Sequence, residues 1–148
     1  AGLNFWHFNA HAKAAGLTEL LSVAAMLEAL GVSEQPPLLG WTFTDATAAS
    51  KAAAIIAFLD ASFEAKALLL ADDTAWDPLR ALMGASDDAT LFVQLRDDYR
   101  AGIVSQYRPD QMDAAAEAFA LMAEFGGSDL VGDTQTLAPG TFWQGYSK

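Results

Sequence analysis

The feature that most constrains the fold is an uninterrupted helical pattern that begins near Thr44. From there until Pro78 the chain contains no glycine or proline, and alanine, the strongest helix former, recurs throughout. Ile55, Leu59 and Phe63 follow a four-residue apolar spacing, which places them on one face of a helix. The stretch therefore predicts one long helix, or two stacked pieces.

Shorter helices are marked by capping residues and glycine stops. We expect helices over about 6–15 and 23–30, ended by Gly16 and Gly31 in a left-handed cap conformation. Three more helices are expected to begin near 72–74, near 86–88 and at Asp110. The apolar residues predicted to face inward on these three helices are Trp76, Leu79, Met83, Phe92, Leu95, Tyr99, Met112, Ala116, Phe119 and Met122.

Short strands are expected near the N-terminus. Residues 2–5 favour a strand, and Leu39, Trp41 and Phe43 alternate with smaller residues at the strand period after Pro36 and Pro37. Residues 17–21 fit a strand or a helical turn equally well. We therefore predict a single, predominantly helical α+β domain over residues 1–148, with two or three short strands near its start.

Composition excludes several classes of function. Eight Lys and Arg stand against nineteen Asp and Glu, so the net charge of −11 disfavours nucleic acid and anionic membrane as partners. No cysteine is present, which excludes disulfides and thiolate chemistry. The start, Ala1-Gly2-Leu3, has no Met and no signal-peptide pattern, which favours a processed or truncated polypeptide.

The segment from Asn4 to His11 is the strongest candidate for a site. Asn4, Trp6, His7 and Asn9 combine an aromatic surface with side chains that hydrogen-bond in either direction, as a small polar ligand requires. A buried strand-to-helix junction with satisfied polar groups explains the same residues equally well.

Catalytic and metal chemistry lack their usual patterns. His7 and His11 have the spacing of a metal pair, but Phe8 stands where a hydrolytic zinc helix carries its glutamate base. No serine lies in a Gly-x-Ser-x-Gly turn, and no glycine loop for phosphate is present. We predict no catalytic residues, metal or cofactor, and no enzymatic activity.

Several segments resemble the substrate-binding proteins of ABC importers of the nitrate/sulfonate/taurine class. The longest is residues 4–21, NFWHFNAHAKAAGLTELL, and shorter similarities follow in the same order along nearly the whole chain. The further segments are Pro37–Phe43, Ala57–Ser62 with Glu64–Lys66, Trp76 with Leu79, Arg80, Leu82 and Met83, and finally Leu130–Gly132 with Leu137 and Pro139–Trp143.

The resemblance implies the C-terminal part of a two-lobed receptor with a periplasmic-binding-protein type II-like fold. It implies a periplasmic, or lipid-anchored extracytoplasmic, protein that binds a small polar or anionic solute and delivers it to an ABC permease. Asn4, Trp6, His7 and Asn9 would border the cleft, and a partial chain would bind solute incompletely. Bare strand edges in residues 1–45 would favour a homodimer. The alternative is a non-catalytic helical module that binds a partner protein.

Overall fold

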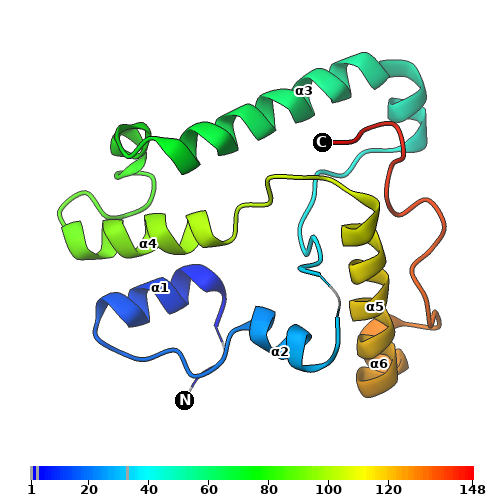
Figure 1. The fold of residues 1–148 in the computed structure, drawn as a ribbon, viewed down its shortest axis with the longest axis horizontal. Helices are drawn as coiled ribbons and strands as arrows, with labels where there is room; N and C mark the ends of the chain where they lie inside the picture. Colours follow the sequence, from blue (N-terminus) through cyan, green and yellow to red (C-terminus); the bar gives the residue numbers. More distant parts are fainter. Residues whose placement is uncertain (1, 3, 33) are drawn as a thin grey trace. The chain divides into compact units, whose positions relative to one another are not determined.

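The computed structural model describes residues 2, 4–32 and 34–148, and its regular elements are helices (Figure 1). Contacts between residues group the chain into two compact units. Unit 1 contains the described residues before Leu21 together with Ala57–Ser105, and unit 2 contains Leu21–Ile56 and Gln106–Lys148. One domain over residues 1–148 stays a prediction. The elements are α1 (Trp6–Ala14), α2 (Val23–Ala29), α3 (Asp45–Ala71), the 3-10 helix η1 (Thr74–Leu79), α4 (Ala89–Ala101), α5 (Pro109–Gly126) and α6 (Ser128–Val131).

The predicted α+β fold is wrong, because the described residues contain no β-strand. Gly2, Asn4 and Phe5 lie outside any regular element, and residue 3 of that predicted strand lies outside the described residues. Residues 17–21 form neither of the two expected elements. Since residues 2, 4–32 and 34–148 form no sheet, the predicted periplasmic-binding-protein type II-like architecture is not observed either.

The segment after Pro36 shows why a strand pattern is not sufficient. Residues 38–43 are non-helical, and Leu39 and Trp41 are 92% and 63% exposed. A strand forms only when a neighbouring chain accepts and donates its backbone hydrogen bonds and covers one of its faces. The alternation of apolar residues is real, but the described chain provides no such neighbour.

The predicted helix ends are confirmed at α1 and α2. Gly16 and Gly31 both have φ +84°, a region that only glycine enters without strain. After α1 the amide of Gly16 donates to Lys13 O at 2.9 Å and that of Leu17 to Ala12 O at 2.9 Å. This pair of bonds is the Schellman motif, which satisfies the last carbonyls of the helix.

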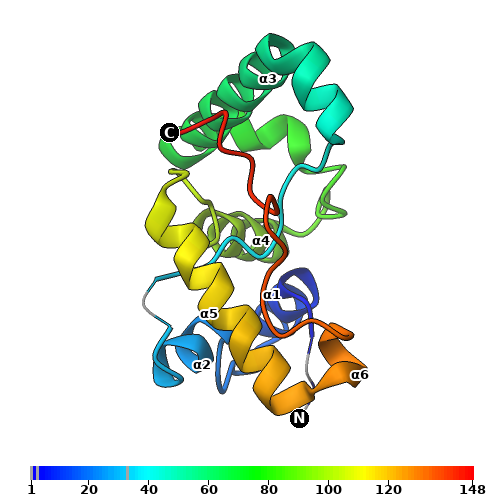
Figure 2. The ribbon, with the colours of Figure 1, turned by 90° about the vertical axis from the view of Figure 1, so that its right-hand side faces the viewer.

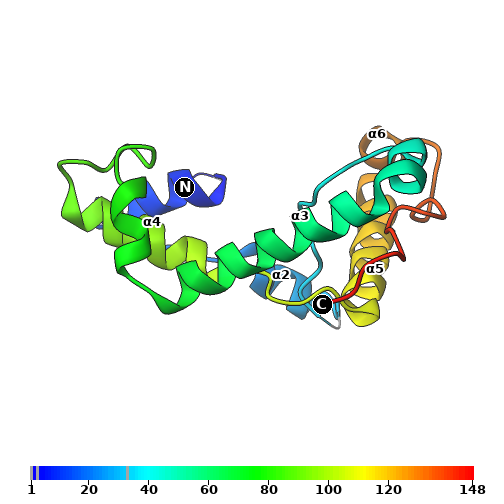
Figure 3. The ribbon, with the colours of Figure 1, turned by 90° about the horizontal axis from the view of Figure 1, so that it is seen from above.

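Helix α3 is long, bent and poorly covered. Lys51 has non-helical angles (φ −132°, ψ 24°), and the bend lies near the start of the helix in Figures 1 and 3. Just before it, Ser50 Oγ donates to Ala46 O at 2.7 Å, a back-bond that commonly bends helices. No residue of α3 is buried. No described helix is long and apolar enough to cross a membrane.

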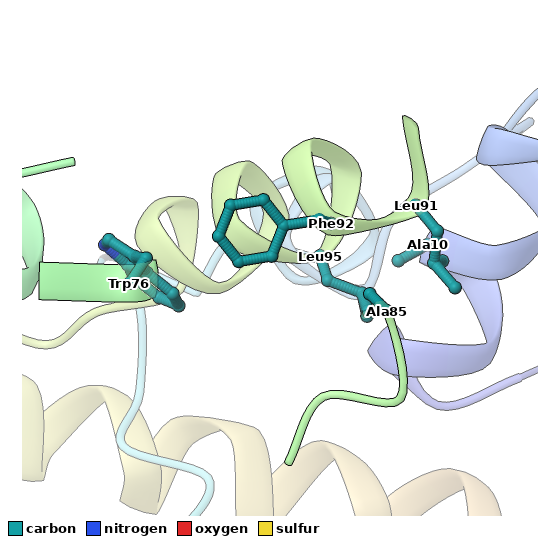
Figure 4. Close-up of a cluster of buried hydrophobic side chains, with 6 residues drawn as sticks. All are labelled: Ala10, Trp76, Ala85, Leu91, Phe92 and Leu95. Atoms are coloured by element: carbon teal, nitrogen blue, oxygen red, sulfur yellow. The ribbon is translucent and has the colours of Figure 1, made fainter. Parts of the chain in front are cut away.

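The core of unit 1 lies where α1 packs beside α4 (Figures 1 and 4). Ala10 is fully buried there, and its small side chain lets the two helices approach closely. Phe92 and Leu95 face inward as predicted and are 2% and 4% exposed. Trp76 of η1, 2% exposed, belongs to the same cluster. The cluster is completed by Ala85 and Leu91.

In unit 2, the buried side chains of α5 are alanines. The predicted inward face of α5 is wrong in part: Ala116 is exposed and Met122 is 44% exposed. The buried positions are instead Ala114, Ala118 and Ala123. The chain after α6 turns back beside α5 (Figure 2).

The C-terminal segment packs against the rest of unit 2, as its apolar residues predict. Trp143 meets Phe43 edge to face, with ring centroids 5.3 Å apart. Tyr107 N donates to Lys148 O at 2.9 Å, and the Tyr107 hydroxyl donates to Trp143 O at 3.3 Å. The pKa of Tyr107 is raised, because burial disfavours its charged form.

Phe92→Ala tests the core of unit 1. We expect a loss of about 3 kcal/mol in the free energy of unfolding, because the substitution leaves a cavity beside Trp76 and Leu95. Phe125→Ala is the matched control: Phe125 is 72% exposed, so its loss should change stability by less than about 0.5 kcal/mol. Urea unfolding followed by circular dichroism measures both, and equal effects would contradict the assignment of the core.

Candidate functional site

The four predicted site residues lie at the start of α1. Asn4 precedes the helix, and Trp6, His7 and Asn9 belong to its first turns. Asn4 and His7 are exposed, Trp6 is 47% exposed and Asn9 is half-buried. The structure therefore places three of the four side chains at the surface of unit 1.

Four neighbouring rings form an exposed aromatic surface, which we call the α1 aromatic surface: Phe5, Trp6, His7 and Phe8. His7 is stacked parallel to Phe5 at 6.2 Å between centroids and lies 4.2 Å from Phe8. Trp6 meets His7 edge to face at 5.8 Å. An exposed aromatic group of this kind offers a flat apolar contact, with the ring nitrogens of His7 as donor or acceptor at its centre.

Trp6 also has a structural role. Its ring meets Tyr99 of α4 edge to face at 5.8 Å, and Tyr99 meets Trp76 in the same way at 5.5 Å. The three rings form a row from the exposed aromatic surface into the core of unit 1. Trp6 is thus held in place by packing while nearly half of its surface stays accessible.

The Asn9 side chain is hydrogen-bonded within the protein. Its side-chain amide donates to Glu19, and Glu19 pairs with Lys13 at 3.2 Å between Oε2 and Nζ. Lys13 Nζ also donates to Asp98 Oδ1 of α4 at 2.8 Å. This polar network ties α1, the segment that follows it and α4 together. Asn9 therefore holds neighbouring parts of unit 1 together, and of the four predicted residues Asn4, Trp6 and His7 are the exposed ones.

Lys13 is the one cation of this network, and its pKa is raised. The largest cause is the hydrogen bond to Asp98, which favours the charged ammonium group, and the bond to Glu19 acts in the same direction. Two carboxylates, Glu19 and Asp98, share the single positive charge of Lys13, so the network is net negative. It therefore offers no net positive charge to an anionic ligand.

Metal binding has no support in the described chain. His11 is exposed and lies one turn after His7. No group of three or more His, Asp or Glu side chains that would hold a metal ion occurs among residues 2, 4–32 and 34–148.

A hollow lies in unit 2. Its volume is about 320 Å³, and it is open to solvent. It lies between α5 and the returning C-terminal segment, and the four predicted residues do not line it. The sequence prediction missed it, because Met112 and Ala116 were assigned to the core instead. The lining residues are Pro109, Met112, Asp113, Ala116, Leu137, Ala138, Gly140, Thr141, Phe142 and Gln144.

Comparison with known proteins identifies no relative: no family model, curated protein or solved structure matches the chain.

Lys13→Gln tests the polar network. At neutral pH we expect a loss of at most about 1 kcal/mol in the free energy of unfolding, because Lys13 is partly exposed to water. The pKa of Lys13 is raised above its ordinary 10.5, so the pairing stabilises the fold fully below about pH 10 and is lost as the pH rises through the folded-state pKa.

The measurement is urea unfolding of the wild type and the variant from pH 7 to 11. Their difference should shrink above pH 10. Lys51→Gln, which removes an exposed lysine in the bend of α3, is the control and should show no such loss. A difference that grows with pH would contradict the proposed pairing.

Proposed function

We propose that this chain is part of a solute-binding component of an ABC importer for a small polar or anionic solute. It is non-catalytic, and it would work in the periplasm or anchored outside the cytoplasmic membrane by a lipid, where it passes solute to the permease. The basis is the ordered resemblance of segments such as residues 4–21 and Pro37–Phe43 to that class of receptors. The helical structure adds no support for the receptor's architecture, so the proposal rests on sequence and on the site.

The single structural observation that supports solute binding is the accessibility of Asn4, Trp6 and His7. Trp6 is anchored by Tyr99, so a ligand would meet a ring that is already fixed and would not have to order it. Asn4 and His7 are exposed and offer both donors and acceptors. A polar solute with one apolar face fits this combination.

The charges favour hydrogen bonding over ion pairing with the solute. Lys13, the nearest lysine in sequence, is shared between Glu19 and Asp98. An anionic solute would therefore be held by neutral donors, such as the Asn4 amide and the His7 ring, with the remaining contacts coming from a longer polypeptide. By itself, the 148-residue chain should bind solute weakly or not at all.

The test uses thermal shift and calorimetry with taurine, alkylsulfonates, nitrate and pyrimidines. We expect no shift for the 148-residue chain, and binding by the longest polypeptide that the gene encodes. In that polypeptide Trp6→Ala should weaken binding at least tenfold, because it removes the anchored ring.

Trp41→Ala is the matched control, since Trp41 is an exposed tryptophan of unit 2. It should change the affinity less than twofold. Strong stabilisation of the 148-residue chain by one solute would contradict partial binding. Equal loss in both tryptophan variants would contradict the assigned site.

A second candidate function is a helical module that binds a partner protein. The observation that favours it is that many large apolar side chains are exposed, Leu39 at 92% and Leu82 at 87% among them. A self-associated dimer is one form of this function. Strand edges cannot mediate it in the described chain, so apolar side chains would. In the region up to residue 45 the large exposed residues are Phe5, Trp6, Phe8, Leu17, Leu20, Leu21, Val23, Leu30, Leu38, Leu39 and Trp41.

Leu39→Asp tests self-association. Leu39 is 92% exposed, so a charge there should cost the monomer less than about 0.5 kcal/mol while opposing any apolar contact between copies. We expect the weight-average mass from light scattering to rise with concentration in the wild type and to rise less in the variant. Leu82→Asp, at a residue of unit 1 that is 87% exposed, is the control. A constant monomer mass in the wild type would contradict the dimer.

A further inference from the structure

The hollow of unit 2 lies between α5 and the C-terminal segment that returns beside it (Figure 2), and polar surface predominates in its lining. Three lining side chains carry polar atoms: Asp113 on α5, and Thr141 and Gln144 on the C-terminal segment. All three are exposed, so a ligand in solution can reach them. The volume of about 320 Å³ is near the lower end of known ligand sites, which limits the occupant to a small molecule.

The hydrogen-bond donors of two of these side chains are already used within the protein. The Thr141 hydroxyl donates to Ala138 O at 2.7 Å. The Gln144 amide nitrogen donates to Phe142 O at 3.2 Å and to Met112 Sδ at 3.7 Å. The atoms that remain for a ligand are therefore the hydroxyl oxygen of Thr141 and the amide oxygen of Gln144, and both are acceptors.

Asp113 adds a third acceptor and a negative charge. Within residues 2, 4–32 and 34–148, its carboxylate takes part in no ion pair or side-chain hydrogen bond. Residues 109–147 of the sequence include no lysine, arginine or histidine, so the lining contains none. Arg108 lies just before α5, but it pairs with Asp110 at 2.9 Å between Nη2 and Oδ2 and does not line the hollow. The lining is thus negatively charged and rich in acceptors.

An anion is the occupant that the start of α5 would otherwise favour, because the N-terminal end of a helix is partly positive. Here Asp110 already compensates that end: Gln111 N donates to Asp110 Oδ1 at 3.0 Å. An anion in the hollow would also meet the Asp113 charge and the acceptor oxygens of Thr141 and Gln144, which have no hydrogen to donate to it. The hollow therefore selects a cation that carries N–H donors.

We propose that the hollow of unit 2 binds a small primary amine in its protonated, ammonium form. The ammonium group pairs with the Asp113 carboxylate, and its remaining N–H groups donate to the side-chain oxygens of Thr141 and Gln144. A short alkyl chain lies against the apolar part of the lining, which includes Met112 and Phe142. The site is open to solvent, so binding is weak, with a dissociation constant on the order of 1 mM. The inference is independent of solute binding at α1.

The test follows ¹H–¹⁵N NMR spectra of the 148-residue chain at neutral pH during titration with n-butylammonium chloride to about 20 mM. We expect the amide signals of residues 112–116 and 140–144 to shift together, with one common dissociation constant. Tetramethylammonium has the same charge but no N–H donor, and 1-butanol has the same alkyl chain but no charge. Butylammonium should bind at least about fivefold more tightly than either, because it alone forms charge-assisted hydrogen bonds.

Matched variants locate the contact. Asp113→Asn should weaken butylammonium binding at least about fivefold. Asp129→Asn removes the same charge at an exposed residue of α6 outside the lining, and should change the affinity less than twofold. Ala116→Leu, which fills the hollow, should also weaken binding, whereas Ala120→Leu, at an exposed residue of α5 outside the lining, should not. Thr141→Val should weaken binding, and Thr141→Ser, which keeps the acceptor oxygen, should restore it.

Several outcomes would overturn the proposal. Equal binding of tetramethylammonium and butylammonium would show general attraction of cations to an acidic protein, and equal loss in both Asp→Asn variants would show the same. Equal binding of 1-butanol would remove the role of Asp113. No shift of residues 112–116 and 140–144 at the end of the titration would reject the site. Circular dichroism and thermal melting confirm that each variant is folded.

Discussion

The packing of unit 1 depends on the hydrogen bonds that the carbonyl groups at the C-terminal end of α3 accept. The last carbonyls of a helix have no partner within it, and Leu69 O is one of them. It accepts hydrogen bonds from Trp76 Nε1 and from Arg100 Nε, each at 2.8 Å. Arg100 and Arg96 also pair with Asp73, at 2.6 and 3.1 Å between Nη1 and the carboxylate oxygens. One carbonyl thus joins α3, η1 and α4, and holds Trp76 where Tyr99 packs on it; Trp6 in turn packs on Tyr99.

The two units differ in how they use their few positively charged side chains. Unit 1 uses its positive side chains for internal contacts: Lys13 bridges Glu19 and Asp98, and the Arg80 guanidinium lies 3.8 Å from the centre of the Phe92 ring. In unit 2, Arg108 pairs with Asp110 at the start of α5. The acidic residues near α4 therefore stabilise the fold.

Local features were predictable from the sequence, and those that need a distant partner were not. Gly16 and Gly31 end helices because a left-handed cap is decided within one turn, and Asp88 caps α4 through Leu91 N at 2.9 Å for the same reason. The strand expected over 38–43 failed because alternation says nothing about a neighbouring chain. The hydrogen bond from Asn9 to Glu19 was not predicted either, because it depends on Glu19 being held by Lys13.

The acidity of the surface has a consequence for handling the protein. Large apolar side chains such as Leu39 and Leu82 are almost fully exposed, and mutual repulsion of a net charge of −11 opposes their contact between copies of the chain at neutral pH. The isoelectric point is about 4.2, so this repulsion vanishes under mildly acidic conditions. Colloidal stability should then be lost before the helices unfold, and turbidity, rather than loss of ellipticity, would mark the acid limit of the protein.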